Sequence, residues 1–249
     1  MTTRIAPPLE ILGITHRYGS LTAVEALDFT VRAGEILGFL GPNGAGKTTT
    51  LRIAAGLLKP TAGEVRIAGA SLFAEPMAAR AGFGFVPDRP ALYERLTAIE
   101  FLEFVAALYR VPPETGEPRA RALLDRLELD AGSPLTADAF SLGMRQKLSI
   151  AAALLHDPPL LMLDEPLGGL DPRGARALKD LLRERAARGF GVLVSTHLLD
   201  VAERLCDRVL ILDHGRKRTE GTLAELREGK ESRSLEDVFL ELTREERAG

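Results

Sequence analysis

The sequence predicts an α/β fold in which a largely parallel sheet is interrupted by an all-helical segment. Two apolar runs, Leu160 to Leu163 and Gly191 to Ser195, have the length and continuity of strands buried on both faces of a parallel sheet. The stretch Arg173 to Arg188 between them has a helical pattern. From about Leu96 to Leu155, by contrast, strand signals are nearly absent and apolar residues recur at helical spacing. A helical insertion of some 60 residues therefore lies within an α/β chain.

The first third of the chain predicts five strands and one helix. Each strand is rich in Ile, Leu, Val or Phe and is closed by glycine or polar residues. The helix begins at Lys47, runs to about Leu57 and stops near Pro60. The expected strands are Leu9 to Thr15, Leu27 to Val31, Glu35 to Leu40, Glu64 to Ile67 and Gly82 to Val86.

The last part of the chain predicts one more strand and two short helices. The strand is Val209 to Leu212, and a turn at His214-Gly215 follows it. The final helix begins near Ser234, where Asp237 is placed to complete a capping box. Its apolar residues share one face, so we expect that face to cover the core. They are Leu235, Val238, Phe239 and Leu242.

The composition is that of a folded globular protein. Of the 249 residues, 45% are hydrophobic and 27% charged, which excludes collagen-like, disordered and low-complexity classes. The length corresponds to about 1.7 typical domains, or one large domain with an insertion. Apolar stretches such as Ile150 to Leu155 are far shorter than the ~18 residues needed to cross a bilayer. With a net charge of -3 and no basic run longer than Arg216-Lys217-Arg218, no nucleic-acid partner is expected.

A phosphate-binding loop follows the strand Glu35 to Leu40. Residues 41–48 fit the pattern G-x-x-x-x-G-K-[ST] between an apolar strand and a helix, a context that a glycine-rich turn without function does not explain. Lys47 is predicted to bridge the β- and γ-phosphates, and the Thr48 hydroxyl to ligate Mg²⁺. The predicted nucleotide-binding residues of this segment are Gly41, Pro42, Asn43, Gly44, Ala45, Gly46, Lys47, Thr48 and Thr49.

Two acidic residues follow the buried run Leu160 to Leu163. Asp164 is predicted to orient Mg²⁺ through its water shell, and Glu165 to polarise an attacking water. An acid before Pro166 is also typical of a helix N-cap. The phosphate-binding loop in the same chain favours the catalytic interpretation.

A third motif identifies a family. The segment Ser141 to Lys147 reads Ser-Leu-Gly-Met-Arg-Gln-Lys and lies about 20 residues before the two acids. It resembles the signature loop of ATP-binding cassette (ABC) ATPases, whose commonest form is L-S-G-G-Q. Ser141 and Gly143 match this form, whereas Phe140, Leu142 and Met144 depart from it. Ser141 is also typical of an N-cap, and the N-terminus of its helix would provide a second anion-binding end.

The resemblance extends over nearly the whole chain and assigns roles to further residues. Tyr18 matches the aromatic residue that stacks on adenine, although an aromatic at that place is by itself more often part of a core. Asp171, which ends Gly168-Gly169-Leu170-Asp171, matches the D-loop. His197 matches the switch histidine that contacts the γ-phosphate. The catalytic residues implied are therefore Glu165, His197 and Lys47.

One position departs from the family pattern. The family usually has Gln after the strand that leads into the helical subdomain, and here Asp88 stands in its place. Aspartate retains an oxygen for Mg²⁺ but has a shorter reach and adds negative charge. We hypothesise that Asp88 senses the metal together with Thr48 and Asp164, and that it moves the helical subdomain when nucleotide binds.

The resemblance implies a P-loop NTPase (RecA-like) core with an antiparallel β subdomain and an inserted all-helical subdomain. The implied ranges are 1–87 and 158–225 for the nucleotide-binding core, 88–157 for the signature subdomain and 226–249 for a helical tail. It also implies a second cassette, either a copy of this chain or a homologue, arranged head to tail around two ATP molecules. Each signature would act on the partner's ATP through Ser141, Leu142, Gly143 and Met144.

Three segments look like the bacterial exporter branch of the family, which works with a separate membrane permease. They are Leu92 to Thr97, the signature, and Ser234 to Leu240. The lone Cys206 cannot form an internal disulfide, and no basic-then-apolar leader precedes residue 20, so we expect a cytoplasmic protein peripheral on the inner face of the cell membrane.

Two other functions compete with transport. One is a soluble ABC-type ATPase that remodels a macromolecular complex, but such proteins usually carry tandem cassettes or a long coiled-coil insert. The other is a regulatory subunit that binds nucleotide without hydrolysing it, which the intact Lys47, Asp164, Glu165 and His197 argue against. A neighbouring gene that encodes about six apolar spans would favour transport. The cargo would be specified by the permease.

Overall fold

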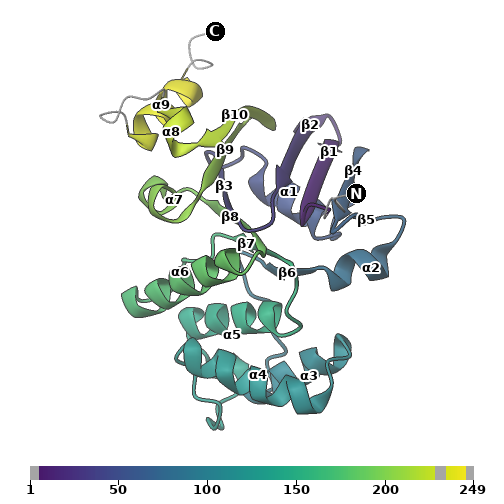
Figure 1. Cartoon of the computed structure of the whole chain (residues 1–249), viewed down its shortest axis with the longest axis vertical. Helices are drawn as coiled ribbons and strands as arrows, with labels where there is room; N and C mark the ends of the chain where they lie inside the picture. The colour runs from purple at the N-terminus through teal and green to yellow at the C-terminus, as the bar shows by residue number, and fades with distance from the viewer. Residues whose placement is uncertain (1–5, 228–233, 245–249) are drawn as a thin grey trace.

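A six-stranded, largely parallel sheet forms the centre of the molecule (Figure 1). The computed structural model describes residues 6–227 and 234–244. The strand order is β10-β9-β3-β8-β7-β6, in which only β10 is antiparallel to its neighbour. The predicted α/β fold is therefore confirmed. The strands are β3 Ile36–Leu40, β6 Phe83–Val86, β7 Leu160–Asp164, β8 Gly191–Thr196, β9 Arg208–Asp213 and β10 Arg216–Thr222.

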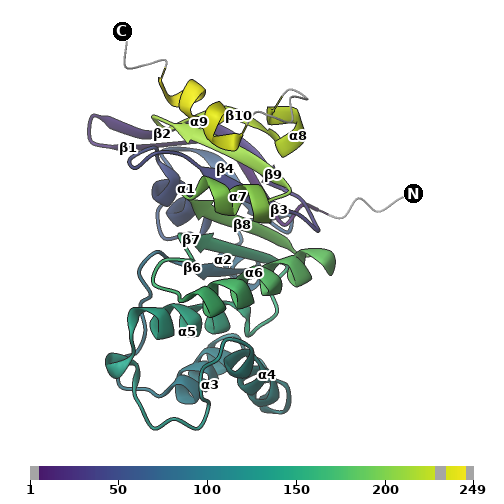
Figure 2. The ribbon, with the colours of Figure 1, turned by 90° about the vertical axis from the view of Figure 1, so that its left-hand side faces the viewer.

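A second sheet is antiparallel, with the order β2-β1-β4-β5, as the family resemblance implied. Its first strand ends at Tyr18, and a tight turn leads into the second. Figure 2 shows that it lies at the end of the molecule opposite the helices of the insertion. The strands are β1 Leu9–Tyr18, β2 Leu21–Val31, β4 Ala62–Ile67 and β5 Ala70–Ser71.

Every element between β6 and β7 is helical, so the predicted helical insertion is confirmed. The first helix begins with a capping box, because the Thr97 hydroxyl accepts from the Glu100 amide and the Glu100 carboxylate accepts from the Thr97 amide at 2.9 Å. The last helix, α5, contacts both β6 and the two preceding helices. The elements are α3 Ala98–Leu108, α4 Pro113–Arg126, the 3-10 turn η1 Ala137–Ala139 and α5 Leu142–Leu154.

The remaining helices, which lie outside the insertion, pack beside the two sheets. The last of them ends at Arg244, the end of the described chain. The predicted capping box at Ser234 is present, with the Asp237 amide donating to the Ser234 hydroxyl at 3.1 Å and the Ser234 amide donating to Asp237 at 2.9 Å. The helices are α1 Lys47–Ala54, α2 Pro76–Ala81, α6 Pro172–Ala187, α7 Leu199–Leu205, α8 Leu223–Leu226 and α9 Leu235–Arg244.

The core has two parts, one on each face of the central sheet, because its strands are buried on both sides. In β3, Leu40 belongs to the cluster formed with the helices of the insertion, and Phe39 to the cluster formed with α1 and the antiparallel sheet. In β7, Leu161 belongs to the cluster with the helices of the insertion, and Met162 to the cluster with α1 and the antiparallel sheet. Cys206 is buried too, and burial raises the pKa of its thiol to about 12, so the thiol stays protonated.

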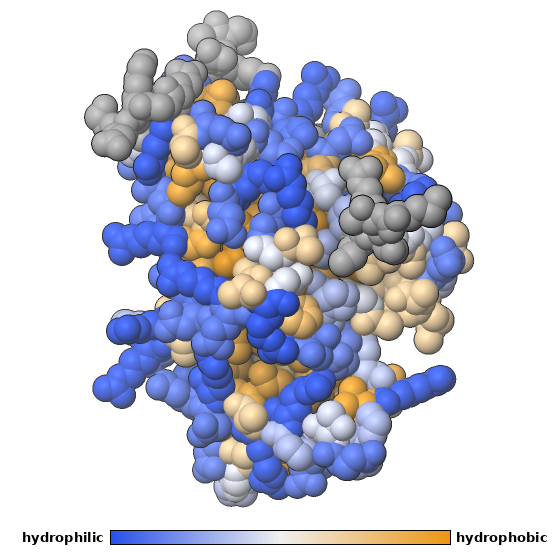
Figure 3. Space-filling model, viewed as in Figure 1, coloured by the Kyte–Doolittle hydropathy of each residue, from blue (hydrophilic) through white to orange (hydrophobic). Residues whose placement is uncertain are grey.

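On the face drawn in Figure 3, hydrophilic residues predominate, and hydrophobic residues appear in patches between them. Within residues 6–227 and 234–244, no helix has both the length and the apolar character that crossing a membrane requires.

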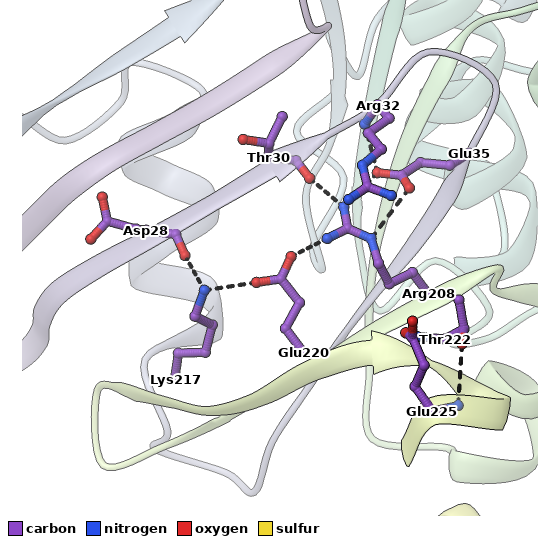
Figure 4. A network of polar contacts seen from close by, with 9 residues as sticks. All are labelled: Asp28, Thr30, Arg32, Glu35, Arg208, Lys217, Glu220, Thr222 and Glu225. Atoms are coloured by element: carbon purple, nitrogen blue, oxygen red, sulfur yellow. Dashed lines mark hydrogen bonds and ion pairs between the residues drawn. The ribbon is translucent and has the colours of Figure 1, made fainter. Parts of the chain in front are cut away.

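A buried ion-pair network joins the two sheets (Figure 4). At the start of β9, Arg208 donates to both carboxylate oxygens of Glu35, at 2.7 and 3.3 Å, and to the Thr30 carbonyl of β2 at 2.6 Å. It also pairs with Glu220 of β10, whose other oxygen accepts from Lys217 at 2.7 Å. The Arg208 and Glu35 side chains are only 9% and 11% exposed. Three chain segments therefore depend on one guanidinium.

Replacing Arg208 with methionine is expected to lower the free energy of unfolding by about 3 kcal/mol, because Glu35 would stay buried without a counter-charge and Glu220 would keep only Lys217. Urea denaturation measures this loss. The exposed pair between Arg121 and Glu117 is a matched control, and Arg121→Met should cost less than about 1 kcal/mol. Equal losses in the two variants would contradict a special role for Arg208.

Candidate nucleotide-binding and catalytic site

The loop 41–46 connects β3 to α1 and requires glycine at three places, including Gly44 with φ +83°. A Cβ at Gly41 would lie 2.3 Å from the Leu212 carbonyl oxygen. Gly46, which precedes α1, has φ +103°, a conformation that residues with a Cβ rarely adopt. Within the loop, the Ala45 amide donates to the Pro42 carbonyl at 3.2 Å. The loop is thus closed over the N-terminus of α1, where helix amides favour anions.

A turn at the end of β9 supports this loop from outside. The Gly215 amide donates to the Ala45 carbonyl at 2.9 Å, and the Gly215 carbonyl accepts from the Glu25 amide of β2 at 2.9 Å. The turn predicted at His214-Gly215 therefore holds the loop against the antiparallel sheet.

The Lys47 side chain folds back over the loop. Its Nζ donates to the Gly41 and Pro42 carbonyls at 2.6 and 3.1 Å. Burial lowers the pKa of Lys47, while the nearby carboxylates of Glu165 and Asp164 oppose that shift. The Lys47 ammonium group therefore lies where the loop, the N-terminus of α1 and the carboxylates of Glu165 and Asp164 meet.

A cleft of about 480 Å³ collects the predicted nucleotide-binding residues. Gly41 alone of the predicted loop residues does not line it. Leu21 and Ala23, which the sequence did not suggest, add an apolar wall from β2. The cleft is lined by Tyr18, Leu21, Ala23, Pro42, Asn43, Gly44, Ala45, Gly46, Lys47, Thr48, Thr49, Asp88, Asp164, Glu165 and His197.

Asp164 ends β7 and is only 2% exposed. Burial raises the pKa of its carboxyl, and the negative charge of Asp88 acts in the same direction. The nearby hydroxyls of Ser195 and Thr48 and the charge of Lys47 oppose this shift in the pKa of Asp164. A buried carboxylate beside a second one is a place where a cation is favourable.

The oxygen donors in the cleft suit Mg²⁺. Asp164, Asp88 and the Thr48 hydroxyl are hard oxygen ligands that line the same space. Among the described residues there is no cluster of three or more His, Cys, Asp or Glu side chains that could hold a metal by itself. This fits a Mg²⁺ ion whose remaining ligands are waters and substrate phosphates.

Glu165 and His197 are hydrogen-bonded to each other. His197 Nδ1 lies 2.9 Å from Glu165 Oε1, and the two side chains are 61% and 23% exposed. Glu165 follows β7, and His197 follows the neighbouring strand β8. Adjacent parallel strands therefore deliver both side chains to the same edge of the sheet, as at ligand sites of other α/β sheets.

Tyr18 stands at the rim of the cleft. It is the last residue of β1 and is 47% exposed, so its ring is not part of the core. The ring of the buried His16 meets it edge to face, with the centroids 4.6 Å apart.

The signature residues lie outside this cleft. Ser141 caps α5, since its hydroxyl accepts from the Met144 amide at 3.2 Å. Gly143 packs so closely on Gly169 that an added Cβ would lie 2.6 Å from that carbonyl oxygen. Asp171 caps α6 by accepting from the Gly174 amide at 2.9 Å. The structure thus separates Ser141, Leu142, Gly143, Met144 and Asp171 from the site formed by the other predicted residues of the same chain.

The fold and the cleft define a P-loop ATPase of the ATP-binding cassette type. The family model for ABC transporters matches residues 24–168, and the chain belongs to this family as an ATP-binding subunit. It is an ATP-hydrolysing transport ATPase.

The similarity to curated relatives covers most of the chain. The ABC-type transporter ATP-binding protein EcsA of Bacillus subtilis (strain 168) is 39% identical over 240 residues, which cover 96% of this chain and 97% of EcsA. The Nod factor export ATP-binding protein I of Ralstonia nicotianae is 40% identical over 88% of this chain and 68% of its own.

Solved structures agree with this assignment. An ATP-binding subunit of an ABC transporter is 38% identical, with a TM-score of 0.89, and the match covers 94% of this chain and 98% of that one. A dimeric ATP-binding cassette in a post-hydrolysis state, bound to ADP and Pi, is 29% identical with a TM-score of 0.78, over 86% of this chain and 98% of the other.

Proposed function

We propose that this chain is the motor of an exporter, in which two cassettes close around ATP and Mg²⁺ and drive a separate permease at the inner face of the cell membrane. The observation that carries this proposal is the division of the predicted residues. The loop, Lys47, the acids and His197 share one cleft, whereas the signature beginning at Ser141 lies elsewhere on the chain. A second cassette is needed to bring a signature to each cleft.

Within one chain, each group in the cleft has a distinct task. On nucleotide binding, Lys47 exchanges the Gly41 and Pro42 carbonyls for phosphate oxygens. Thr48, Asp88 and Asp164 would hold Mg²⁺, which would neutralise charge on the phosphates. Glu165 accepts the proton of the attacking water, and His197, already bonded to Glu165, donates toward the γ-phosphate. The half-exposed Tyr18 ring stacks on adenine.

The partner chain supplies the remaining electrostatics. Ser141 and Gly143 present the N-terminus of α5, an anion-binding end, to the γ-phosphate held by the other chain. The dimeric cassette bound to ADP and Pi supports this arrangement. Loss of the γ-phosphate removes the shared anion, so the dimer opens, and the difference in ATP affinity between the closed and open states provides the stroke.

Export through a permease is supported by relatives that include a Nod factor export protein and a daunorubicin resistance protein. This chain offers the permease a groove of about 230 Å³ between β6 and the helical segment. Apolar side chains such as Phe85, Leu92 and Tyr109 line it, and Pro87 connects it directly to Asp88 in the nucleotide cleft. A permease helix bound in this groove would therefore respond to whether nucleotide occupies the cleft.

Co-purification tests the exporter role. A tagged chain, isolated from its native host in mild detergent, should retain a membrane protein with about six apolar spans. Leu92→Glu, which charges the groove, should release that protein, while the exposed control Leu108→Glu should retain it. Retention of a ribosomal or chromosomal complex instead would favour the remodelling ATPase.

Asp88→Ala is expected to weaken Mg-ATP binding and lower turnover by about tenfold each, because a carboxylate of the metal environment is lost. Binding of ATP without Mg²⁺ should change little, which equilibrium titration with and without the metal can show. Asp125→Ala, an exposed substitution outside the cleft, is the control. If Asp88→Ala left Mg-ATP affinity and turnover unchanged, the metal-sensing role would be abandoned.

A further inference from the structure

The backbone around Glu165 is held in an unusual conformation. Glu165 has φ +48°, in the left-handed region that non-glycine residues rarely occupy. Its amide donates to the Ser195 carbonyl at 3.0 Å, and its carbonyl accepts from the Gly168 amide at 3.1 Å. The Ser195 contact comes from the core strand β8, and the Gly168 contact comes from the loop that follows Glu165. Such strain persists only where the surroundings fix the backbone.

A third contact comes from the helical segment. Gln146, in the second turn of α5, donates from Nε2 to the carbonyl of Pro166 at 3.2 Å. Gln146 is 1% exposed, and Pro166 directly follows Glu165. A buried hydrogen bond of this kind is costly to break, because the carbonyl would then lack a partner.

The same face of α5 contacts the rest of the loop after Glu165. The Lys147 ammonium lies 4.0 Å from the Asp171 carboxylate and 3.6 Å from that of Glu128. Gly143 lies against the Gly169 carbonyl, where a Cβ would not fit. The loop from Pro166 to Asp171 is therefore supported along its length by the signature helix.

We propose that Gln146 is a positioning residue that fixes the Glu165 carboxylate of its own chain through the Pro166 carbonyl. This inference rests on the proposed role of Glu165 as the residue that activates water. A leucine would fill the same space at 146, but unlike the Gln146 amide it cannot donate to the buried Pro166 carbonyl. Because the Glu165 backbone is strained, releasing Pro166 lets the carboxylate move away from the water that it orients. Each signature helix thereby adjusts the general base of its own chain while it serves the partner's ATP.

Gln146→Leu in the full chain should lower kcat for ATP hydrolysis about tenfold, since displacements near 1 Å can cost a comparable or larger factor. The rate is expressed per bound nucleotide, so that unfolded protein does not contribute, and KM for ATP should stay within about twofold. Ser149→Ala, a small polar change on the same helix, should leave kcat unchanged. An unaltered kcat in Gln146→Leu overturns the proposal.

Mixed dimers decide whether the effect acts within one chain. In a dimer with Ser141→Arg on one chain only, the active site that remains uses Glu165 of the Ser141→Arg chain and Ser141 of its partner. Adding Gln146→Leu to the Ser141→Arg chain should slow this site about tenfold, because that chain supplies Glu165. Adding it to the partner should have little effect.

The reverse result would show that Gln146 acts on the signature and would overturn the proposal, as would equal slowing in both placements. Failure of the proposed function looks different. In that case Glu165→Gln, or Ser141→Arg on both chains, would hydrolyse ATP at the normal rate whatever residue stands at 146.

Discussion

Glu165→Gln is expected to reduce kcat for ATP hydrolysis by about 10²-fold or more while ATP still binds. The amide keeps the size of the side chain and can still hydrogen-bond to His197 Nδ1, which lies 2.9 Å from Oε1 in the native protein. What it loses is the ability to accept a proton from water. Steady-state phosphate release measures the rate, and equilibrium titration with ATP measures the binding.

The same variant should accumulate as a dimer when ATP is present. Hydrolysis is the step that removes the shared γ-phosphate, so blocking it holds the two cassettes closed, and size-exclusion chromatography would show an ATP-dependent shift to twice the mass. Glu114→Gln, an exposed substitution on α4, controls for the change in net charge and should behave like the native chain. Normal turnover by Glu165→Gln would remove Glu165 from the mechanism.

The residues of the cleft could be predicted because each group is encoded in a short contiguous segment. The loop 41–48 and the run that ends in Asp164-Glu165 combine a buried strand with the functional residues that follow it. Because parallel strands end at the same edge of a sheet, the two segments meet in one cleft. His197 follows another such strand, so its meeting with Glu165 has the same origin.

Contacts between distant segments could not be predicted in this way. The Gly215 turn that supports the loop and the apolar wall of Leu21 and Ala23 depend on how β9 and β2 pair, which the local pattern does not specify. Gln146 was visible within the signature, but a buried glutamine in a helix does not reveal which carbonyl it contacts. Its donation to Pro166 appears only when the two segments pack together.

Some helices and strands also could not be predicted from the local sequence pattern. The strand β10 was missed because Arg216–Thr222 is polar and lacks alternation, yet it pairs with β9 and its Glu220 neutralises Arg208. The short helices α2 and α7 were missed as well, since six or seven residues hold too few turns for a helical period. The expected extension of α1 to Leu57 was too long, because the helix ends at Ala54. The strand expected at Leu27 begins at Leu21 instead, where exposed and half-buried residues conceal the pattern.

Ser141→Arg is expected to abolish turnover while leaving ATP affinity unchanged. Ser141 is exposed at the N-terminus of α5, so the bulky side chain disrupts no core and costs only the cap, about 1 kcal/mol. It does not line the cleft of its own chain, so nucleotide binding there should not respond. In the closed dimer, however, the arginine would occupy the space between the partner's γ-phosphate and the helix. Ser141→Ala, which also loses the cap but adds no bulk, should retain part of the activity.

A complementation experiment tests most directly whether Ser141 acts on the ATP of the partner chain. When inactive Ser141→Arg and inactive Glu165→Gln chains are mixed before ATP is added, the mixed dimer has one site with an intact Glu165 and an intact Ser141. If the chains pair at random, half of the dimers are mixed, so activity should return to about a quarter of the native value. Two inactive chains can restore activity only if each site takes its base from one chain and its signature from the other. A mixture as inactive as its components would contradict this arrangement of the dimer.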